Sequence, residues 1–324
     1  MPEPNSERAA QVLSLPDGSR VGIADYGAPD GAPVLALHGA PASRLMFSVA
    51  DVAACAANFR IIAPDRPGYG LTAVDRNPTL DRRAEWLEKV ADALGLDRFA
   101  ILAISGGGPY ATALASRLGN RVTALALVSP MGPIADVMAT TPANRPAVPF
   151  LQRRFFLHLP RRWIFPPLAR LAARIFMASP RGFVGGFPRL IGDPDAHILR
   201  KPHIREAMLA MTREALRDGA EGGIADLRIY GAPWNIDIAR ITAPAMLWQG
   251  TADRIVPVAA ALHLARLIPG CRLMRLEGAG HFWVFDHMTE VFAGLRAMTE
   301  ISSSAGAAIR PALGSVGTTL PTRT

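Results

Sequence analysis

Cysteine, lysine and long hydrophobic runs are scarce in this 324-residue sequence. Two cysteines, Cys55 and Cys271, are too few for a disulfide framework, and their apolar neighbours favour small core residues. No apolar run reaches the roughly 18 residues that a membrane-spanning helix needs. The first residues, MPEPNSERAAQ, have neither a basic start nor an apolar stretch, so no secretory signal is expected. These absences predict a cytoplasmic protein.

Lysine occurs only as Lys89 and Lys201, so arginine supplies almost all of the positive charge in a chain with a formal net charge of +8. Residues 131–240 hold 16 basic and 9 acidic residues, which leaves the rest of the chain almost neutral. A basic chain suggests a nucleic-acid partner. However, zinc-ligand spacing, ribonucleoprotein motifs and uniformly basic helices are all absent, so we expect no nucleic-acid binding.

Short apolar runs alternate with helical patterns through most of the chain. The turn signal Pro16-Asp17-Gly18 separates two strand-like runs, 12–15 and 20–26. A parallel sheet covered on both faces gives this pattern. The further predicted strands are 34–37, 60–63, 99–104, 122–128, 245–249 and 272–276, and the predicted helices are 81–94, 109–118, 258–267 and 289–298.

The rhythm breaks after Ser129, where a segment rich in Pro, Arg, Phe and Met has helical spacing and no strand-like run. It resumes near residue 240. The last residues are rich in Ser, Gly, Ala, Thr and Pro and have no periodicity. We therefore expect a flexible N-terminus (1–10), an α/β core (11–130 and 240–300), a helical cap (131–239) and a disordered tail (301–324).

The strongest local signal is FAILAISGGGPY, residues 99–110, in which a strand leads into Ser105 and a helix follows at once. A nucleophile on such a sharp turn needs small neighbours, and Ala103 and Gly107 occupy the crowded positions. A phosphate-binding glycine loop is the alternative interpretation. It is disfavoured because the glycines do not follow G-x-G-x-x-G and the strand is not the first in the chain.

Serine becomes a strong nucleophile only when a base accepts its proton and a carboxylate orients that base. Asp253 follows the strand 245–249, and His281 follows the strand 272–276. Both stand in loops at the carboxyl ends of strands, in the chain order serine, acid, histidine. We therefore predict a catalytic triad of Ser105, Asp253 and His281, with His287 a poor second choice for the base.

The early strand 34–37 ends in a loop, His38-Gly39-Ala40-Pro41, that can face Ser105. We predict that the backbone amides of Ala40 and Gly106 form an oxyanion hole, with the amide of Gly106 at a positive helix end. His38 is expected to brace the loop by hydrogen bonding rather than to transfer protons. No metal and no organic cofactor are expected.

Five motifs of the sequence together resemble those of the α/β-hydrolase superfamily. They are HG-x-P at 38–41, DRPGYG at 65–70, the serine turn, DRIVP at 253–257 and G-x-GHF at 278–282. The sequence is similar to its cap-bearing bacterial members, among them esterases, non-haem haloperoxidases and carbon–carbon bond hydrolases. The resemblance implies the α/β-hydrolase fold, a mostly parallel central sheet with helices on both faces and a helical cap insertion. Ser105 separates the chain from epoxide hydrolases and haloalkane dehalogenases, which attack with an aspartate.

The expected function is hydrolysis of an ester or related acyl bond in a small, largely apolar substrate, through an acyl-enzyme. A cofactor-free C–C hydrolase, lyase or perhydrolase with the same triad is one alternative, and a non-catalytic ligand-binding protein is another. Phe282 and Trp283, directly after the base, are candidates for the substrate pocket, and cap aromatic residues such as Phe155, Trp163 and Phe176 either close that pocket or pack the helices. A solvated arginine-rich face is the preferred interpretation of the basic cap, and steering of anionic substrates or contact with an acidic lipid surface are the alternatives.

Overall fold

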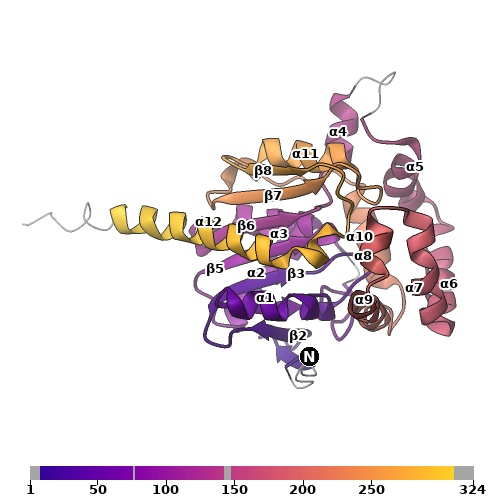
Figure 1. Ribbon diagram of the computed structural model, residues 1–324, viewed down its shortest axis with the longest axis horizontal. Helices are drawn as coiled ribbons and strands as arrows, with labels where there is room; N and C mark the ends of the chain where they lie inside the picture. Colours follow the sequence, from indigo (N-terminus) through magenta and orange to yellow (C-terminus); the bar gives the residue numbers. More distant parts are fainter. Residues whose placement is uncertain (1–7, 76, 142–146, 310–324) are drawn as a thin grey trace, which may run out of the picture.

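The computed structural model describes residues 8–75, 77–141 and 147–309, which form one eight-stranded sheet with helices on both faces (Figure 1). The strand order is β1-β2-β4-β3-β5-β6-β7-β8, and all pairs are parallel except β1/β2 and β2/β4. This confirms the predicted mostly parallel sheet. The strands are β1 (Gln11–Ser14), β2 (Arg20–Gly27), β3 (Ala32–Leu37), β4 (Phe59–Pro64), β5 (Phe99–Ile104), β6 (Val122–Val128), β7 (Ala245–Gly250) and β8 (Arg272–Leu276).

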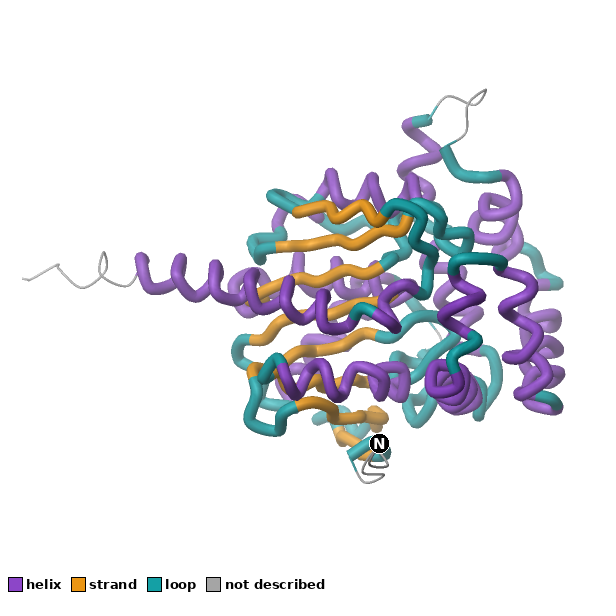
Figure 2. The backbone as a smooth tube through the Cα atoms, viewed as in Figure 1, coloured by secondary structure: helices purple, strands orange, loops and turns teal. Residues whose placement is uncertain are grey.

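Figure 2 shows helices in front of and behind the strands. Between the sheet and these helices, two hydrophobic cores lie on opposite faces of the sheet. In β5, Ile101 and Ala103 join one core and Ala100 and Leu102 join the other, as the two-residue period of a strand requires. Every residue of β5 is buried, which explains why its sequence is continuously apolar. One face is covered by α2 (Leu80–Ala93), α3 (Gly108–Leu118) and α11 (Val258–Leu267), and the other by α1 (Asp51–Ala56) and α12 (Met288–Ile309).

The described residues between β6 and β7 form a set of helices that we call the insertion (Figure 1). It lies beside the carboxyl ends of the strands, where the loops after β5, β7 and β8 also lie. Its α-helices are α4 (Ile134–Thr140), α5 (Phe150–Arg153), α6 (Phe165–Ala178), α7 (Pro180–Ile191), α8 (Asp195–Leu199), α9 (Pro202–Ala215) and α10 (Glu221–Tyr230).

Parts of both ends that were predicted to be flexible belong to the described structure. Arg8 donates a hydrogen bond to Asp25 at 3.3 Å, and the carbonyl of Ala9 accepts one from Arg44 at 2.8 Å. Helix α12 continues through Ile309, because the alanines that made 301–309 look featureless are also the best helix formers. Residues 1–7 and 310–324 lie outside the described residues.

The prediction that both cysteines are core residues is wrong for Cys55, which is exposed, whereas Cys271 is partly buried. Cys55 stands on α1, and only Ala54 of that short helix is buried against the sheet. Apolar neighbours in the sequence therefore did not mean an apolar environment. Among the described helices, none combines the length and hydropathy needed to cross a bilayer.

Candidate active site

Ser105 occupies a sharp turn between β5 and α3. Its φ of +55° lies in the left-handed region that residues other than glycine rarely adopt, so the backbone holds the serine in a strained conformation. A Cβ atom at Gly107 would lie 2.3 Å from the carbonyl oxygen of Leu37, which is closer than any side chain allows. Glycine at 107 thus lets the turn approach β3, as the sequence pattern predicted.

The structure brings Ser105, His281 and Asp253 together at the carboxyl ends of β5, β8 and β7. The Oγ of Ser105 lies 3.0 Å from Nε2 of His281, and Nδ1 of His281 lies 2.8 Å from Oδ2 of Asp253. A carboxylate only accepts hydrogen bonds, so the ring proton belongs on Nδ1. Nε2 is then free to accept the hydroxyl proton of Ser105. All three residues are buried.

The loop after β7 fixes the carboxylate of Asp253. Its Oδ1 accepts hydrogen bonds from the amides of Ile255 at 2.8 Å and Val256 at 3.0 Å. The side-chain amide of Gln249 donates to Oδ2 at 3.1 Å. These bonds leave Oδ2 directed at the imidazole, so Asp253 can orient His281 and stabilise its protonated form.

A second carboxylate reaches the histidine loop from the insertion. Asp195, at the start of α8, accepts hydrogen bonds from the amides of His281 at 2.9 Å and Phe282 at 2.7 Å. Burial of the imidazole lowers the pKa of His281, but the charge and hydrogen bond of Asp253 and the charge of Asp195 outweigh it. The pKa of His281 is therefore raised above its ordinary value of 6.5.

The two predicted oxyanion donors lie next to each other beside Ser105. A Cβ atom at Gly106 would be 3.1 Å from the Cβ of Ala40, and one at Gly39 would be 3.2 Å from the Cβ of Ser105. The loop 38–41 therefore packs directly on the serine turn. This adjacency is what a hole formed by the amides of Ala40 and Gly106 requires.

His38 braces this loop, as predicted. Its Nε2 accepts the amide hydrogen of Arg66 at 3.0 Å, which leaves the proton on Nδ1 to be donated to the carbonyl of Gly39 at 2.8 Å. Complete burial and the nearby Arg66 charge lower the pKa of His38. The ring is therefore neutral and fixed by hydrogen bonds.

A buried polar cluster, which the sequence did not reveal, joins the insertion to the two loops beside Ser105. At its centre Asp226 of α10 pairs with Arg66 at 2.7 Å, and Arg66 also donates to the carbonyl of Gly39 at 2.8 Å. The hydroxyl of Tyr230 lies 3.0 Å from the Gly106 carbonyl and 3.0 Å from Asp226, so its one proton serves either acceptor. We call this group, completed by Tyr69 and Tyr110, which also donate to Asp226, the Asp226 cluster.

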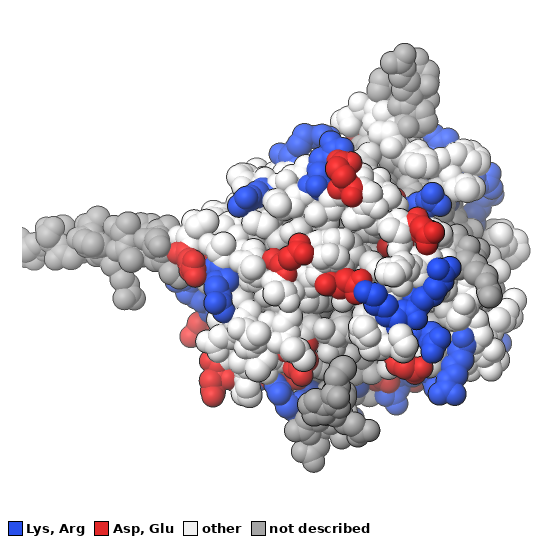
Figure 3. All heavy atoms as spheres, in the orientation of Figure 1, with Lys and Arg blue, Asp and Glu red and all other residues white. Residues whose placement is uncertain are grey.

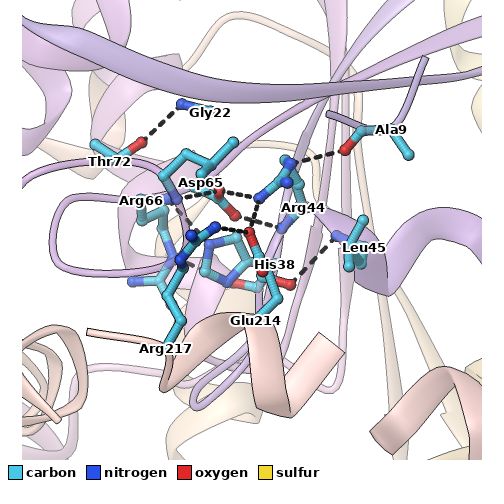
Figure 4. A network of polar contacts seen from close by, with 12 residues as sticks. Ala9, Gly22, His38, Arg44, Leu45, Asp65, Arg66, Thr72, Glu214 and Arg217 are labelled. Carbon is cyan, nitrogen blue, oxygen red and sulfur yellow. Dashed lines mark hydrogen bonds and ion pairs between the residues drawn. The ribbon is translucent and has the colours of Figure 1, made fainter. Parts of the chain in front are cut away.

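The motif DRPGYG at 65–70 connects the Asp226 cluster with a second buried ion pair, shown in Figure 4. Asp65 pairs with Arg44 at 2.6 Å, and Arg44 also pairs with Glu214 of α9 at 2.7 Å. A Cβ atom at Gly70 would lie 2.1 Å from the carboxylate of Asp65, and the φ of Gly70 is +52°, so no other residue fits there. The motif thus holds the loops behind the serine rather than taking part in the chemistry.

Sequence reasoning missed these acidic residues because it counted the charge of the insertion as a whole. Three acidic residues of the insertion bind groups of the core. Asp195 accepts hydrogen bonds from two backbone amides, and Glu214 and Asp226 each pair with a buried arginine. The one available signal was local. Asp226 follows Ile224 and Ala225 in a mostly apolar helix, of which Arg228 is the one exposed residue.

A cavity of about 220 Å³ lies over Ser105 and His281. Phe282, one of the two candidates for the substrate pocket, lines it. Trp283 does not, because its ring is stacked on His287 with a centroid distance of 4.3 Å. Of the cap aromatic residues named above, Phe176 lines the cavity, whereas Phe155 and Trp163 are exposed. The remaining lining is mostly apolar and includes Ala40, Pro41, Ala42, Met46, Val184, Phe187, Leu199, Met208, Met211 and Ile255.

In the described part of the chain, no three His, Cys, Asp or Glu side chains are grouped so that they could hold a metal ion.

Comparisons with known proteins show the family to which the chain belongs. The profile of the alpha/beta hydrolase fold family matches residues 32–288. The chain is 28% identical to a 2-hydroxymuconate semialdehyde hydrolase of Pseudomonas putida, over 91% of this chain and 94% of that protein. It is 27% identical to a non-heme chloroperoxidase of Streptomyces lividans, over 85% of this chain and 94% of the other. An esterase from Exiguobacterium antarcticum has the same fold, with a TM-score of 0.64 and 19% identity over 90% of this chain and 99% of that one. The chain therefore belongs to the alpha/beta hydrolase fold family.

Proposed function

We propose that this protein is a serine hydrolase that cleaves an ester or related acyl bond through an acyl-enzyme. The observation that carries the proposal is the alignment of Ser105 Oγ, 3.0 Å from His281 Nε2, with Asp253 2.8 Å from the other ring nitrogen. The family assignment supports a hydrolase activity in general terms.

In the proposed reaction, His281 accepts the proton of Ser105 as its oxygen attacks the acyl carbon. The amides of Ala40 and Gly106 stabilise the resulting oxyanion. His281 then protonates the leaving group, and the carbonyl re-forms as an acyl-enzyme. The same imidazole then takes a proton from water, whose oxygen attacks the acyl carbon. The acid product leaves as His281 returns this proton to the oxygen of Ser105.

The cavity supports a small, uncharged acyl substrate. Its volume of about 220 Å³ is below the roughly 300–1,000 Å³ that is usual for sites of drug-sized ligands. Neither lysine nor arginine is among the described residues that line it, so a carboxylate on the substrate would have no cationic partner there. Short-chain esters fit these properties best.

The second candidate is a C–C hydrolase, which the likeness to the Pseudomonas putida enzyme favours. By its name, the substrate of that relative carries a carboxylate. The uncharged lining described above makes us prefer the ester assignment for this chain. Lyase and perhydrolase chemistry would use the same three residues and differ only in the substrate or the acyl acceptor.

A series of p-nitrophenyl esters of increasing acyl length tests the proposal, with Ser105→Ala as the control. We expect hydrolysis that is fastest for short acyl groups and a loss of about 10⁴-fold or more in the variant, because the three residues act as a unit. Activity of Ser105→Ala close to that of the wild type would exclude the mechanism.

Labelling with a fluorophosphonate separates an enzyme from a non-catalytic ligand-binding protein of the same fold. An activated serine forms a covalent adduct with this probe, so we expect modification at Ser105 in the folded wild type and none in Ser105→Ala. If Ser105 is not labelled, the proposed activity is wrong. If it is labelled but no ester is cleaved, a C–C hydrolase or lyase takes its place.

A further inference from the structure

The outer side of the insertion exposes an unusual number of hydrophobic side chains. Of the 15 large hydrophobic residues that are exposed in the described part of the chain, nine fall within residues 150–177. We call the exposed side chains of 150–177 the outer insertion face. Trp163 is 86% exposed, Leu151 78% and Ile175 60%. Monomeric proteins seldom leave so much contiguous apolar surface in water unless it binds something.

These residues form one continuous surface. Ile164, Leu168, Leu171 and Ile175 recur at intervals of four, three and four, which places them on a single stripe along α6. All four are exposed, whereas the opposite side of the helix buries Phe165 and Phe176. Ile164 and Trp163 also line a groove with residues of α5, so the stripe of α6 continues into that groove.

Arginine is the only charged residue type in this part of the chain. From Val137 to Gly192 the sequence has nine arginines and no aspartate or glutamate. Arg154, Arg162 and Arg174 are exposed, and of the arginines of the outer insertion face only Arg170 forms an ion pair within the described residues, with Glu221 at 2.8 Å. Figure 3 shows Lys and Arg side chains over the insertion, on the right of that view.

We propose that the outer insertion face docks the protein on an anionic lipid bilayer. Leucine, isoleucine and tryptophan would enter the boundary between headgroups and acyl chains, and the arginines would contact the negative headgroups. A second copy of this chain is a poorer partner, because it would bring an equally positive surface against the arginines. An anionic bilayer can bury the apolar stripe and bind the positive charge at the same time.

The same helix connects this surface with the cavity over Ser105. Phe176 faces the cavity while Ile175, its neighbour in α6, lies on the outer insertion face. A bilayer bound at this face would thus lie one helix away from the cavity. The docking proposal itself does not depend on the proposed hydrolase activity, since binding is measured separately.

Co-sedimentation of the full chain with vesicles tests the proposal. We expect binding to vesicles of phosphatidylglycerol and phosphatidylcholine at low salt, and binding weaker by on the order of tenfold to phosphatidylcholine alone or at high salt. Equal binding to both kinds of vesicle, or no binding to either, would overturn the proposal.

Two pairs of substitutions separate the contribution of the apolar stripe to vesicle binding from that of the arginine charge. Leu171→Glu with Ile175→Glu removes the apolar stripe, and Arg154→Glu with Arg162→Glu reverses charge beside it. Each pair should weaken binding to anionic vesicles by on the order of tenfold or more. Val52→Glu, at a residue 73% exposed on α1, and Arg82→Glu, at an exposed residue of α2, are the matched controls and should bind like the wild type. If the controls lose as much binding as the two pairs, the outer insertion face is not the docking surface.

Because Leu171 and Ile175 lie outside the active site, hydrolysis of a soluble ester should be unchanged in that variant, which also shows that it is folded. Tryptophan emission gives a direct readout: vesicles should shift it to the blue in the wild type but not in Trp163→Leu, which keeps the apolar surface and still binds. Dimerisation in sedimentation analysis that Leu171→Glu abolishes, without vesicle binding, would instead assign this face to a second copy of the chain.

Discussion

The carboxylate of Asp195 accepts a hydrogen bond of 2.9 Å from the backbone amide of His281, although the two residues lie 86 positions apart in the sequence. Asp195 belongs to the insertion and His281 to the core, so the insertion supplies part of the support for His281, the proposed base. A Cβ atom at Gly280 would lie 2.3 Å from the carboxylate of Asp195, which explains the glycine before the histidine. The insertion therefore supports the candidate active site and also forms one wall of the cavity.

Asp195→Asn should move the pH profile. The base works only when neutral, so kcat/KM of the wild type should fall toward low pH with an apparent pKa above the ordinary 6.5 of histidine. Removing the negative charge of Asp195 makes protonated His281 less stable and lowers its pKa. The acidic limb of the profile should thus move to lower pH, as measured by kcat/KM against pH on one ester.

Asp193→Asn is the control for that experiment, because Asp193 is an exposed neighbour and accepts no bond from the histidine loop. Its profile should match that of the wild type. An acidic limb that stays in place in Asp195→Asn would show that Asp195 acts through its hydrogen bonds alone.

Asp226→Asn should destabilise the fold. It leaves Arg66, which is 2% exposed, without an anionic partner, and uncompensated buried charge typically costs about 3–5 kcal/mol. The measurement is the free energy of unfolding in urea. Asp218→Asn, whose side chain is 83% exposed, should change it by less than about 1 kcal/mol. Similar values for the two variants would mean that the Asp226 cluster contributes no coupling between insertion and core.

Gly107→Ala should lower both stability and activity. The new methyl group would lie 2.3 Å from the carbonyl oxygen of Leu37. Such overpacking lowers the free energy of unfolding by about 1–3 kcal/mol or more, and the backbone shift that removes the clash displaces the neighbouring Ser105. Gly185→Ala is the matched control, since its Cβ atom would meet nothing within 4 Å and alanine favours the helix by about 0.5–1 kcal/mol. Opposite signs are thus expected in the unfolding free energies of the two variants.

Phe282→Ala should change the preference for acyl length. Its ring lines the cavity and packs against Phe187, with a centroid distance of 6.2 Å, so truncation leaves space for a longer acyl group. Rates over the p-nitrophenyl series should shift toward longer esters. Trp283→Phe, outside the cavity, should keep the order of the wild type; a shift in that variant instead would place Trp283 in contact with substrate.

Sequence alone determined the sheet and the order of the catalytic candidates. Buried parallel strands must be continuously apolar, and loops at their carboxyl ends meet at one edge, so Ser105, Asp253 and His281 could be expected to lie together. The tight turn at Gly107 followed from the same local pattern. Such features depend on neighbours in the chain, which a sequence shows directly.

Only the tertiary structure decided which residues support the site and which face outward. Asp195, Glu214 and Asp226 look like ordinary surface acids in sequence, and their partners lie far away along the chain. The stripe of α6 has the spacing of a buried face but points to solvent, because helical periodicity fixes that residues share a side and says nothing about what that side meets. Burial and partnership are properties of the packed chain.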